Sequence, residues 1–149
     1  MLVRDAMSRN AESVEPEVSL MYVAQRMKEK NIACLPVYEA GKLTGIITDR
    51  DIVCRGVAVT DNLMDLKARD VMTVGSYFAS EDQSLEDAVR LMGEREIYHL
   101  PVLDRQNRLT GMLALPDLAI KGSKEFLGIM NALLARDAVR RRETAEAGA

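Results

Sequence analysis

The segment Gly45–Asp51, with the sequence GIITDRD, has the residue types and spacing best suited to chemistry. Its apolar first half reads as a strand that runs into the start of a helix. The hydroxyl of Thr48 and the free backbone N–H groups of that helix start suit a phosphate. Asp51, about one turn further on, can accept hydrogen bonds from two neighbouring hydroxyl groups such as those of ribose. A second interpretation stays open, in which Thr48 and Asp51 only cap the helix.

This pattern occurs within a repeat that runs through most of the chain. The second copy follows the first after about 65 residues and keeps the same order of motifs. The matching pairs are Asp5–Ser8 with Asp70–Thr73, Ile32–Val37 with Ile97–Val102, and Gly45–Asp51 with Gly111–Asp117. The repeat predicts two copies of one small unit packed against each other, and the differences between the copies carry the functional information.

Each copy predicts the element order strand, helix, strand, strand, helix. Apolar residues recur at helical spacing after Ser19 and again after Ser84, and both serines stand where an N-cap belongs. Asp87, three residues after Ser84, resembles the second member of a capping box. The two apolar runs after each helix are separated by a short polar turn and predict a β-hairpin. Beyond Asp117 a helix is expected, and residues 140–149 are expected to be a solvated, frayed tail.

Composition narrows the class of protein. The 149 residues, 48% hydrophobic and 29% charged, are those of one soluble globular body. No run of roughly 18–20 apolar residues is present to span a membrane, and the amino terminus lacks a secretory signal, so a cytoplasmic location is expected. The net charge of −3 gives no general attraction to nucleic acid. Cys34 and Cys54 lie in apolar stretches, which favours buried reduced thiols over the alternative of a disulfide.

The residues with catalytic potential are few. His99 is the single histidine, and two distant cysteines do not make a zinc site, so no metal site is expected. Glycine-rich phosphate loops of the common types are absent from the sequence. Asp49 and Asp51 favour capping or hydroxyl binding over general acid/base catalysis. We therefore expect a protein that is not an enzyme.

Taken together and in duplicate, these motifs resemble the cystathionine-β-synthase (CBS) domain family, and specifically a tandem pair, or Bateman module. The resemblance covers roughly residues 2–120. It implies an α+β fold of two βαββα repeats packed through their sheets with pseudo-two-fold symmetry. We place repeat 1 at residues 1–65, repeat 2 at residues 66–122, and a C-terminal helix and tail at residues 123–149.

The same resemblance implies two clefts that bind adenosine compounds. In the first cleft Thr48 and Asp51 would contact phosphate and ribose, with Asp49 and Arg50 beside them. Tyr98 and His99, from the other repeat, would stack on the ligand or form hydrogen bonds with it. The segment after the second opening motif, notably Ser76, Tyr77, Phe78 and Ala79, would form the wall of the adenine pocket.

The second cleft departs from the family pattern. Asp117 keeps the acid, but Ala114 replaces the hydroxyl and Pro116 precedes the acid. Its borrowed residues, Ala33 and Cys34, offer neither charge nor strong donors. We therefore expect one competent cleft and a second that binds weakly or not at all.

Structural alternatives remain open for several of these side chains. Tyr98 can be core or hairpin packing, and His99 can be half-buried and face no ligand. Phe78 can be a core residue, Tyr77 can fill a gap between sheets, and Arg50 can be a solvated helix residue.

The expected function is that of a stand-alone regulatory module that requires no cofactor. It would sense AMP, ADP or ATP, with S-adenosylmethionine or NAD less favoured, and modulate an unknown protein effector, as a homodimer without nucleic-acid or membrane partners. The alternative is a structural dimerisation or interaction module with vestigial pockets, whose contact stripe would be Phe126, Met130, Leu133 and Leu134. A nucleic-acid role through Arg136 and residues 140–142 is a more distant possibility.

Overall fold

The computed structural model describes residues 1–121 and 124–148. The predicted boundary between residues 122 and 123, like Ala149, lies outside the described residues. The chain forms two compact units, which we name after one acid in each. The Asp51 unit comprises Asn10–Phe78 and Leu103–Thr110, and the Asp117 unit comprises Met1–Arg9, Ala79–Val102 and Gly111–Ala149. The mixture of helices and antiparallel strands in both units confirms the predicted α+β class.

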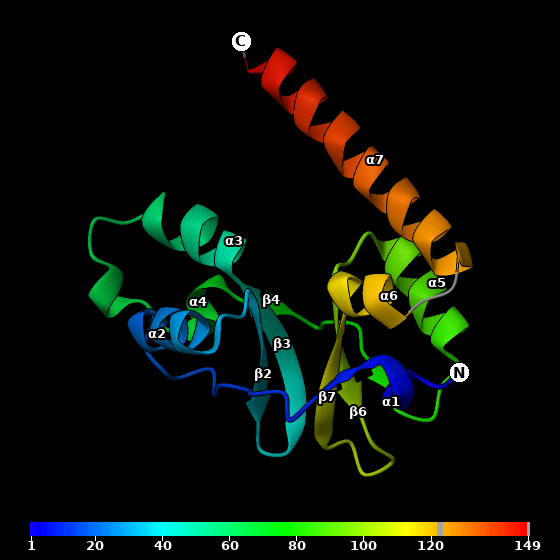
Figure 1. Ribbon diagram of the computed structural model, residues 1–149. Helices are drawn as coiled ribbons and strands as arrows, with labels where there is room; N and C mark the ends of the chain where they lie inside the picture. The colour runs from blue at the N-terminus through cyan, green and yellow to red at the C-terminus, as the bar shows by residue number, and fades with distance from the viewer. Residues whose placement is uncertain (122–123, 149) are drawn as a thin grey trace. The chain divides into compact units, whose positions relative to one another are not determined.

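The Asp51 unit is built on a three-stranded sheet in the order β2-β3-β4 (Figure 1). Its strands are β2 (Cys34–Glu39), β3 (Lys42–Thr48) and β4 (Thr73–Val74), so the predicted hairpin is confirmed. Its helical segments are α2 (Leu20–Lys30), α3 (Asp49–Asp51), the π-helix η1 (Ile52–Val57), the 3-10 helix η2 (Leu63–Asp65) and α4 (Ala68–Val71). The core contains Val14, Leu20, Val23, Met27, Leu35, Val37, Ile47, Ala68 and Val71.

The Asp117 unit has a four-stranded sheet in the order β1-β7-β6-β5. Its strands are β1 (Ser8–Arg9), β5 (Ala79–Ser80), β6 (His99–Leu103) up to Val102, and β7 (Leu109–Ala114) from Gly111 on. Its helices are α1 (Val3–Ala6), α5 (Leu85–Arg95), α6 (Leu115–Lys121) and α7 (Lys124–Ala147). The core contains Val3, Ala6, Met7, Ala79, Leu85, Ala88, Val89, Met92, Leu100, Val102, Leu113, Leu115, Leu118, Phe126 and Leu133.

The two predicted N-caps behave differently. Ser19 caps α2, where its hydroxyl oxygen accepts a hydrogen bond from the Tyr22 backbone N–H at 3.1 Å. Ser84 occupies the N-cap position of α5, but its side chain makes no capping hydrogen bond, so the predicted capping box is wrong. Asp87 instead pairs with Arg90 at 3.6 Å, on the exposed surface of the same helix.

The opening motif of each sequence repeat lies in the unit that holds the hairpin of the other repeat. Strand β1, at the end of the first opening motif, pairs with β7, so that Ser8 lies opposite Met112. Strand β4, at the end of the second opening motif, pairs with β3, so that Thr73 lies opposite Ile46. Each unit therefore depends on backbone hydrogen bonds between segments that lie far apart in the sequence.

Helix α7 is longer than the sequence suggested. It runs without a break to Ala147, so the prediction of a frayed tail is wrong for residues 140–147, whereas their predicted exposure to solvent is confirmed. Ion pairs stabilise this region, because Arg140 pairs with Asp137 at 2.9 Å and with Glu96 at 3.1 Å. In Figure 1 the beginning of α7 lies beside α5, and both helices contribute to the surface described below.

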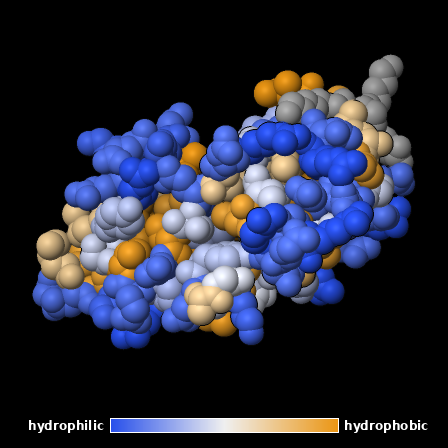
Figure 2. All heavy atoms as spheres, turned by 90° about the horizontal axis from the view of Figure 1, so that it is seen from below, coloured by the Kyte–Doolittle hydropathy of each residue, from blue (hydrophilic) through white to orange (hydrophobic). Residues whose placement is uncertain are grey.

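One face of the molecule is shown in Figure 2 by the hydropathy of its residues. On the face shown in Figure 2 hydrophilic residues predominate, and hydrophobic residues form smaller areas among them. Within residues 1–121 and 124–148, no helix has both the length and the apolar composition that a membrane span requires.

Candidate functional site

Thr48 and Asp51 form a reciprocal cap at the start of α3. Thr48 has an extended backbone, and its hydroxyl oxygen accepts a hydrogen bond from the Asp51 backbone N–H at 3.2 Å. In return Asp51 Oδ2 accepts a hydrogen bond from the Thr48 backbone N–H at 2.9 Å. The predicted cap is therefore confirmed, and the interpretation that these residues only cap the helix stays open. The cap does not exclude ligand binding, because it fixes the carboxylate through one oxygen and leaves the other for further contacts.

The second oxygen of Asp51 contacts a residue that the sequence analysis did not single out. Asp51 Oδ1 lies 2.6 Å from Arg55 Nη2, in an ion pair between positions four residues apart. The same Nη2 donates a hydrogen bond to Thr73 Oγ1 at 2.9 Å, from β4. The spacing of Asp51 and Arg55 is a recognisable helical pair in the sequence. The presence of Thr73 beside them depends on the pairing of β4 with β3.

Asp49 and Arg50 lie at the surface of the same helix start. Both residues are exposed, and the Arg50 backbone N–H donates to Asp49 Oδ1 at 2.7 Å. The Asp49 backbone N–H donates to Ala33 O at 3.0 Å, which ties the helix start to the residue before β2. Contacts of these side chains with a ligand stay a prediction.

Cys34 is the buried residue next to this helix start. It lies opposite Thr48 in the β2–β3 pairing, within the Asp51 unit. Burial raises the pKa of its thiol to about 12, and the charges of Asp51 and Asp49 add to that effect. Cys54, in η1, is exposed, so the prediction of two buried thiols is wrong for Cys54, while both cysteines are free as expected. A role for Cys34 beside Asp117 stays a prediction.

We expect these two thiols to differ sharply in reactivity. A chromogenic thiol reagent at pH 8 should modify Cys54 in the folded protein and Cys34 only after unfolding, because a buried thiol with so high a pKa holds almost no thiolate. Stopped-flow absorbance would count one fast thiol per chain. The matched control, Cys54→Ser, should show none before denaturant is added, and two fast thiols in the unmodified chain would contradict the placement of Cys34.

Three predicted site residues follow β4 in the Asp51 unit. The Ser76 hydroxyl oxygen is buried, and no hydrogen-bond partner for it occurs among the described residues. Tyr77 and Phe78 are 43% and 50% exposed, respectively. The alternative of Phe78 as a core residue is therefore wrong, and the alternative of Tyr77 as a gap filler between sheets stays open. The segment combines an unsatisfied hydroxyl with two accessible aromatic rings.

Asp117 has a related but distinct environment in the Asp117 unit. Its Oδ2 accepts a hydrogen bond from the Ala114 backbone N–H at 3.0 Å, which matches the bond between Asp51 and Thr48. Its Oδ1 accepts a hydrogen bond from the Ser8 hydroxyl at 3.0 Å. Ser8 is the repeat equivalent of Thr73. The acid at position 117 thus has a neutral hydroxyl partner where Asp51 has a guanidinium partner.

Tyr98 and His99 begin the hairpin of the Asp117 unit and are both half-buried. Tyr98 packs against the core of that unit, as the structural alternative expected. Burial raises the pKa of the Tyr98 hydroxyl, and the negative charge of Asp137 on α7 adds to this effect. That Tyr98 and His99 contact a ligand bound by Thr48 and Asp51 stays a prediction.

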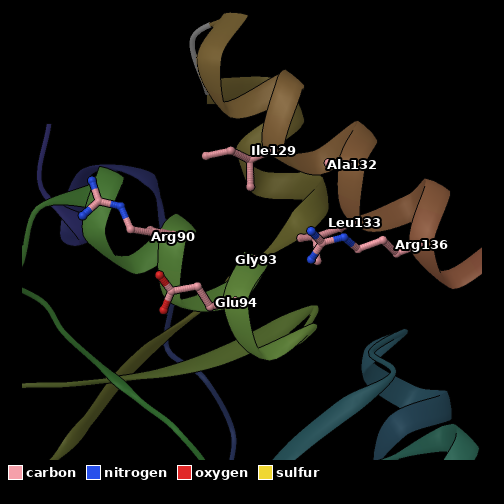
Figure 3. Close-up of a pocket in the computed structure, with 7 residues that line it drawn as sticks. All are labelled: Arg90, Gly93, Glu94, Ile129, Ala132, Leu133 and Arg136. Atoms are coloured by element: carbon pink, nitrogen blue, oxygen red, sulfur yellow. The ribbon is translucent and has the colours of Figure 1, made fainter.

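A surface groove lies between α5 and α7 of the Asp117 unit, with a volume of about 250 Å³. Figure 3 shows Arg90 and Glu94 on α5 and Ile129, Leu133 and Arg136 on α7 along it. The residues that line this groove are other than the predicted ligand residues. In the described part of the chain, no group of three or more His, Cys, Asp or Glu side chains is arranged to hold a metal ion.

Comparison with known proteins finds the same family twice along the chain. The model of the CBS domain matches residues 3–56 and 68–121. The CBS domain-containing protein YhcV of Bacillus subtilis (strain 168) is 37% identical over 118 residues, which are 79% of this chain and 83% of that protein.

Solved structures of CBS domain pairs have the same fold. The CBS domain pair of MJ0100, in complex with 5′-methylthioadenosine and S-adenosyl-L-methionine, is 29% identical, with a TM-score of 0.70 over 80% of this chain and 94% of that one. CBSX2 from Arabidopsis thaliana, in complex with AMP, is 25% identical, with a TM-score of 0.71 over the same 80% and 94%.

Proposed function

The chain belongs to the CBS domain family, and we propose that its Asp51 unit binds an adenosine nucleotide and thereby regulates a partner protein. The observation that carries this proposal is the fixed carboxylate of Asp51, held by the Thr48 backbone N–H at 2.9 Å. An ionised acceptor held in one orientation suits the two adjacent hydroxyl groups of ribose, because hydrogen bonds to an ionised group are the stronger ones. The adenosine compounds bound to CBSX2 and MJ0100 support the ligand class.

Other residues of the Asp51 unit supply the remaining contacts that such a ligand needs. The unsatisfied Ser76 hydroxyl can donate or accept a hydrogen bond, and burying it without a partner is unfavourable. Tyr77 and Phe78 are exposed aromatic residues of the same segment, and their rings are suited to stacking on adenine. We propose AMP, ADP or ATP as the ligand and propose that Asp117 binds more weakly, because position 114 has no hydroxyl.

Regulation would follow from differential affinity. A nucleotide shifts a conformational equilibrium only if it binds one conformation more tightly than the other. We propose that the module acts in this way as a cytoplasmic homodimer on an effector protein, without catalysis of its own. A binding role is supported by Asp51 and Asp117, because each carboxylate accepts a hydrogen bond from a backbone N–H at the start of its helix.

Substitution of Asp51 tests this function. Asp51→Asn keeps the side-chain volume and an oxygen that can accept the Thr48 bond, but it removes the charge that strengthens the bonds to ribose. Isothermal titration calorimetry with AMP, ADP, ATP, NAD and S-adenosylmethionine should show binding of at least one nucleotide to the unmodified protein. Asp51→Asn should weaken it about tenfold to a hundredfold, since hydrogen bonds to charged groups contribute roughly 1.5–3 kcal/mol.

Asp117→Asn is the matched comparison, because Asp117 makes the equivalent bond to its own helix start. It should weaken nucleotide binding much less than Asp51→Asn does. Absence of binding at millimolar nucleotide, or equal losses in the two variants, would count against the proposed site. Circular dichroism melts of both variants show whether the fold is retained.

A further inference from the structure

Arg55 is the positively charged group in direct contact with the acid that we propose to hold the ribose. Its Nη2 lies 2.6 Å from Asp51 Oδ1 and donates to Thr73 Oγ1 at 2.9 Å. The Asp51 side chain is 18% exposed, whereas that of Arg55 is 43% exposed. The pair thus joins a largely buried carboxylate to a guanidinium that still reaches the solvent.

Because of this contact, a ribose hydroxyl that bonds to Asp51 Oδ1 comes close to the Arg55 guanidinium. One carboxylate oxygen is bonded to the Thr48 backbone N–H and the other faces Arg55, so a ribose that bonds both oxygens meets the guanidinium. A sugar at the oxygen that faces Arg55 either shares it with the guanidinium or displaces the guanidinium. The Arg55 side chain of this ion pair is 43% exposed, so its guanidinium can turn to solvent and either outcome is accessible. In both cases a positive charge remains beside the bound sugar.

The charge of the ligand then becomes decisive. An uncharged nucleoside whose hydroxyl groups donate hydrogen bonds to Asp51 competes with Arg55 and gives it no new counter-ion. A nucleotide carries its phosphate on the same ribose, and arginine binds phosphate through strong charge-assisted hydrogen bonds. Asp49 and Asp51 would otherwise make this helix start unfavourable for an anion, and Arg55 offsets that charge.

We infer that Arg55 makes the Asp51 site selective for phosphorylated adenosine compounds over uncharged or sulfonium-bearing ones. The inference rests on the proposed function, because it concerns the same site. It addresses a choice that the relatives leave open, since MJ0100 is seen with 5′-methylthioadenosine and S-adenosyl-L-methionine, and CBSX2 is seen with AMP.

The test compares the affinities for AMP and adenosine by calorimetry in the unmodified protein and in two variants of Arg55. The unmodified protein should bind AMP at least about tenfold more tightly than adenosine, the ratio expected of one charge-assisted contact to phosphate. Arg55→Gln should weaken AMP binding and leave adenosine binding equal or tighter, so that the ratio falls towards one. Arg55→Lys keeps the charge and should keep most of the preference.

Arg90→Gln is the matched control, because Arg90 forms an ion pair with Glu86 at the same helical spacing, on α5 of the Asp117 unit. It removes the same charge and should leave the ratio of the two affinities unchanged. An unchanged ratio in Arg55→Gln, with AMP binding still sensitive to Asp51→Asn, would overturn this inference and leave the proposed function standing. Loss of AMP binding by the unmodified protein, or indifference to Asp51→Asn, would overturn the proposed function itself.

Discussion

Replacing Gly111 with alanine is expected to destabilise the folded protein by about 3 kcal/mol, the upper part of the usual range for overpacking. A Cβ at position 111 would lie 2.5 Å from the Ser8 carbonyl oxygen and 2.7 Å from Met7 Sδ. The closest neighbour is backbone, which cannot rotate away as a side chain can. Relief requires that β1 move away from β7, which would weaken the sheet and the Ser8 contact with Asp117.

Gly45→Ala should have a comparable effect, because a Cβ there would lie 2.5 Å from the Thr73 carbonyl oxygen. Gly128 in α7 provides the control, since a Cβ built at that position has no heavy atom within 4 Å in the described structure. Gly128→Ala should stabilise the helix by about 0.5–1 kcal/mol. Urea denaturation of the three variants measures these differences, and equal behaviour of Gly111→Ala and Gly128→Ala would contradict the close pairing of β1 with β7.

The second large effect is expected at Leu133 of α7. This side chain is 3% exposed and belongs to the core of the Asp117 unit together with Phe126. Leu133→Ala should lower the free energy of unfolding by about 2–5 kcal/mol, because it removes buried methyl groups and leaves a cavity. The neighbouring Leu134 is 50% exposed, so Leu134→Ala should cost less than about 1 kcal/mol. Thermal and urea melts of the two variants make this comparison.

This pair of variants also bears on the alternative of an interaction module. The stripe Phe126, Met130, Leu133 and Leu134 was predicted as a contact surface, but Phe126 and Leu133 are buried within the unit itself. If Leu134→Ala left stability unchanged but altered the mass measured by light scattering, the exposed part of the stripe would serve an interface between chains. If the mass is unchanged, α7 acts as a structural helix of the Asp117 unit.

The sequence predicted the features that depend on neighbouring residues. Helix α2, its Ser19 cap and the two hairpins follow from periodicity and turn residues within a few positions of each other. The cap between Thr48 and Asp51 is also local, because its two hydrogen bonds join residues three positions apart. The family is recognisable for the same reason, since its motifs are short and recur in order.

These local patterns could not predict which side chains are buried or which distant segments pair with each other. Phe78 and Cys54 lie in apolar stretches and yet are exposed, because the face that a residue turns to solvent depends on which element packs against it. Arg140, in the helical part of the tail, pairs with Glu96, which is 44 residues away in the sequence. Local composition alone does not indicate such a partner.

The candidate site shows the same division. The sequence by itself determined that a hydroxyl and an acid stand at a helix start in the first copy, and that the second copy has lost the hydroxyl. Only the tertiary structure decided that Arg55, which is four positions from Asp51, also reaches Thr73, and that Asp117 is bonded to Ser8, 109 residues away. The physical reason is that a cap and a helical ion pair join residues three or four positions apart, whereas Thr73 and Ser8 are brought to these acids by strand pairing between distant segments.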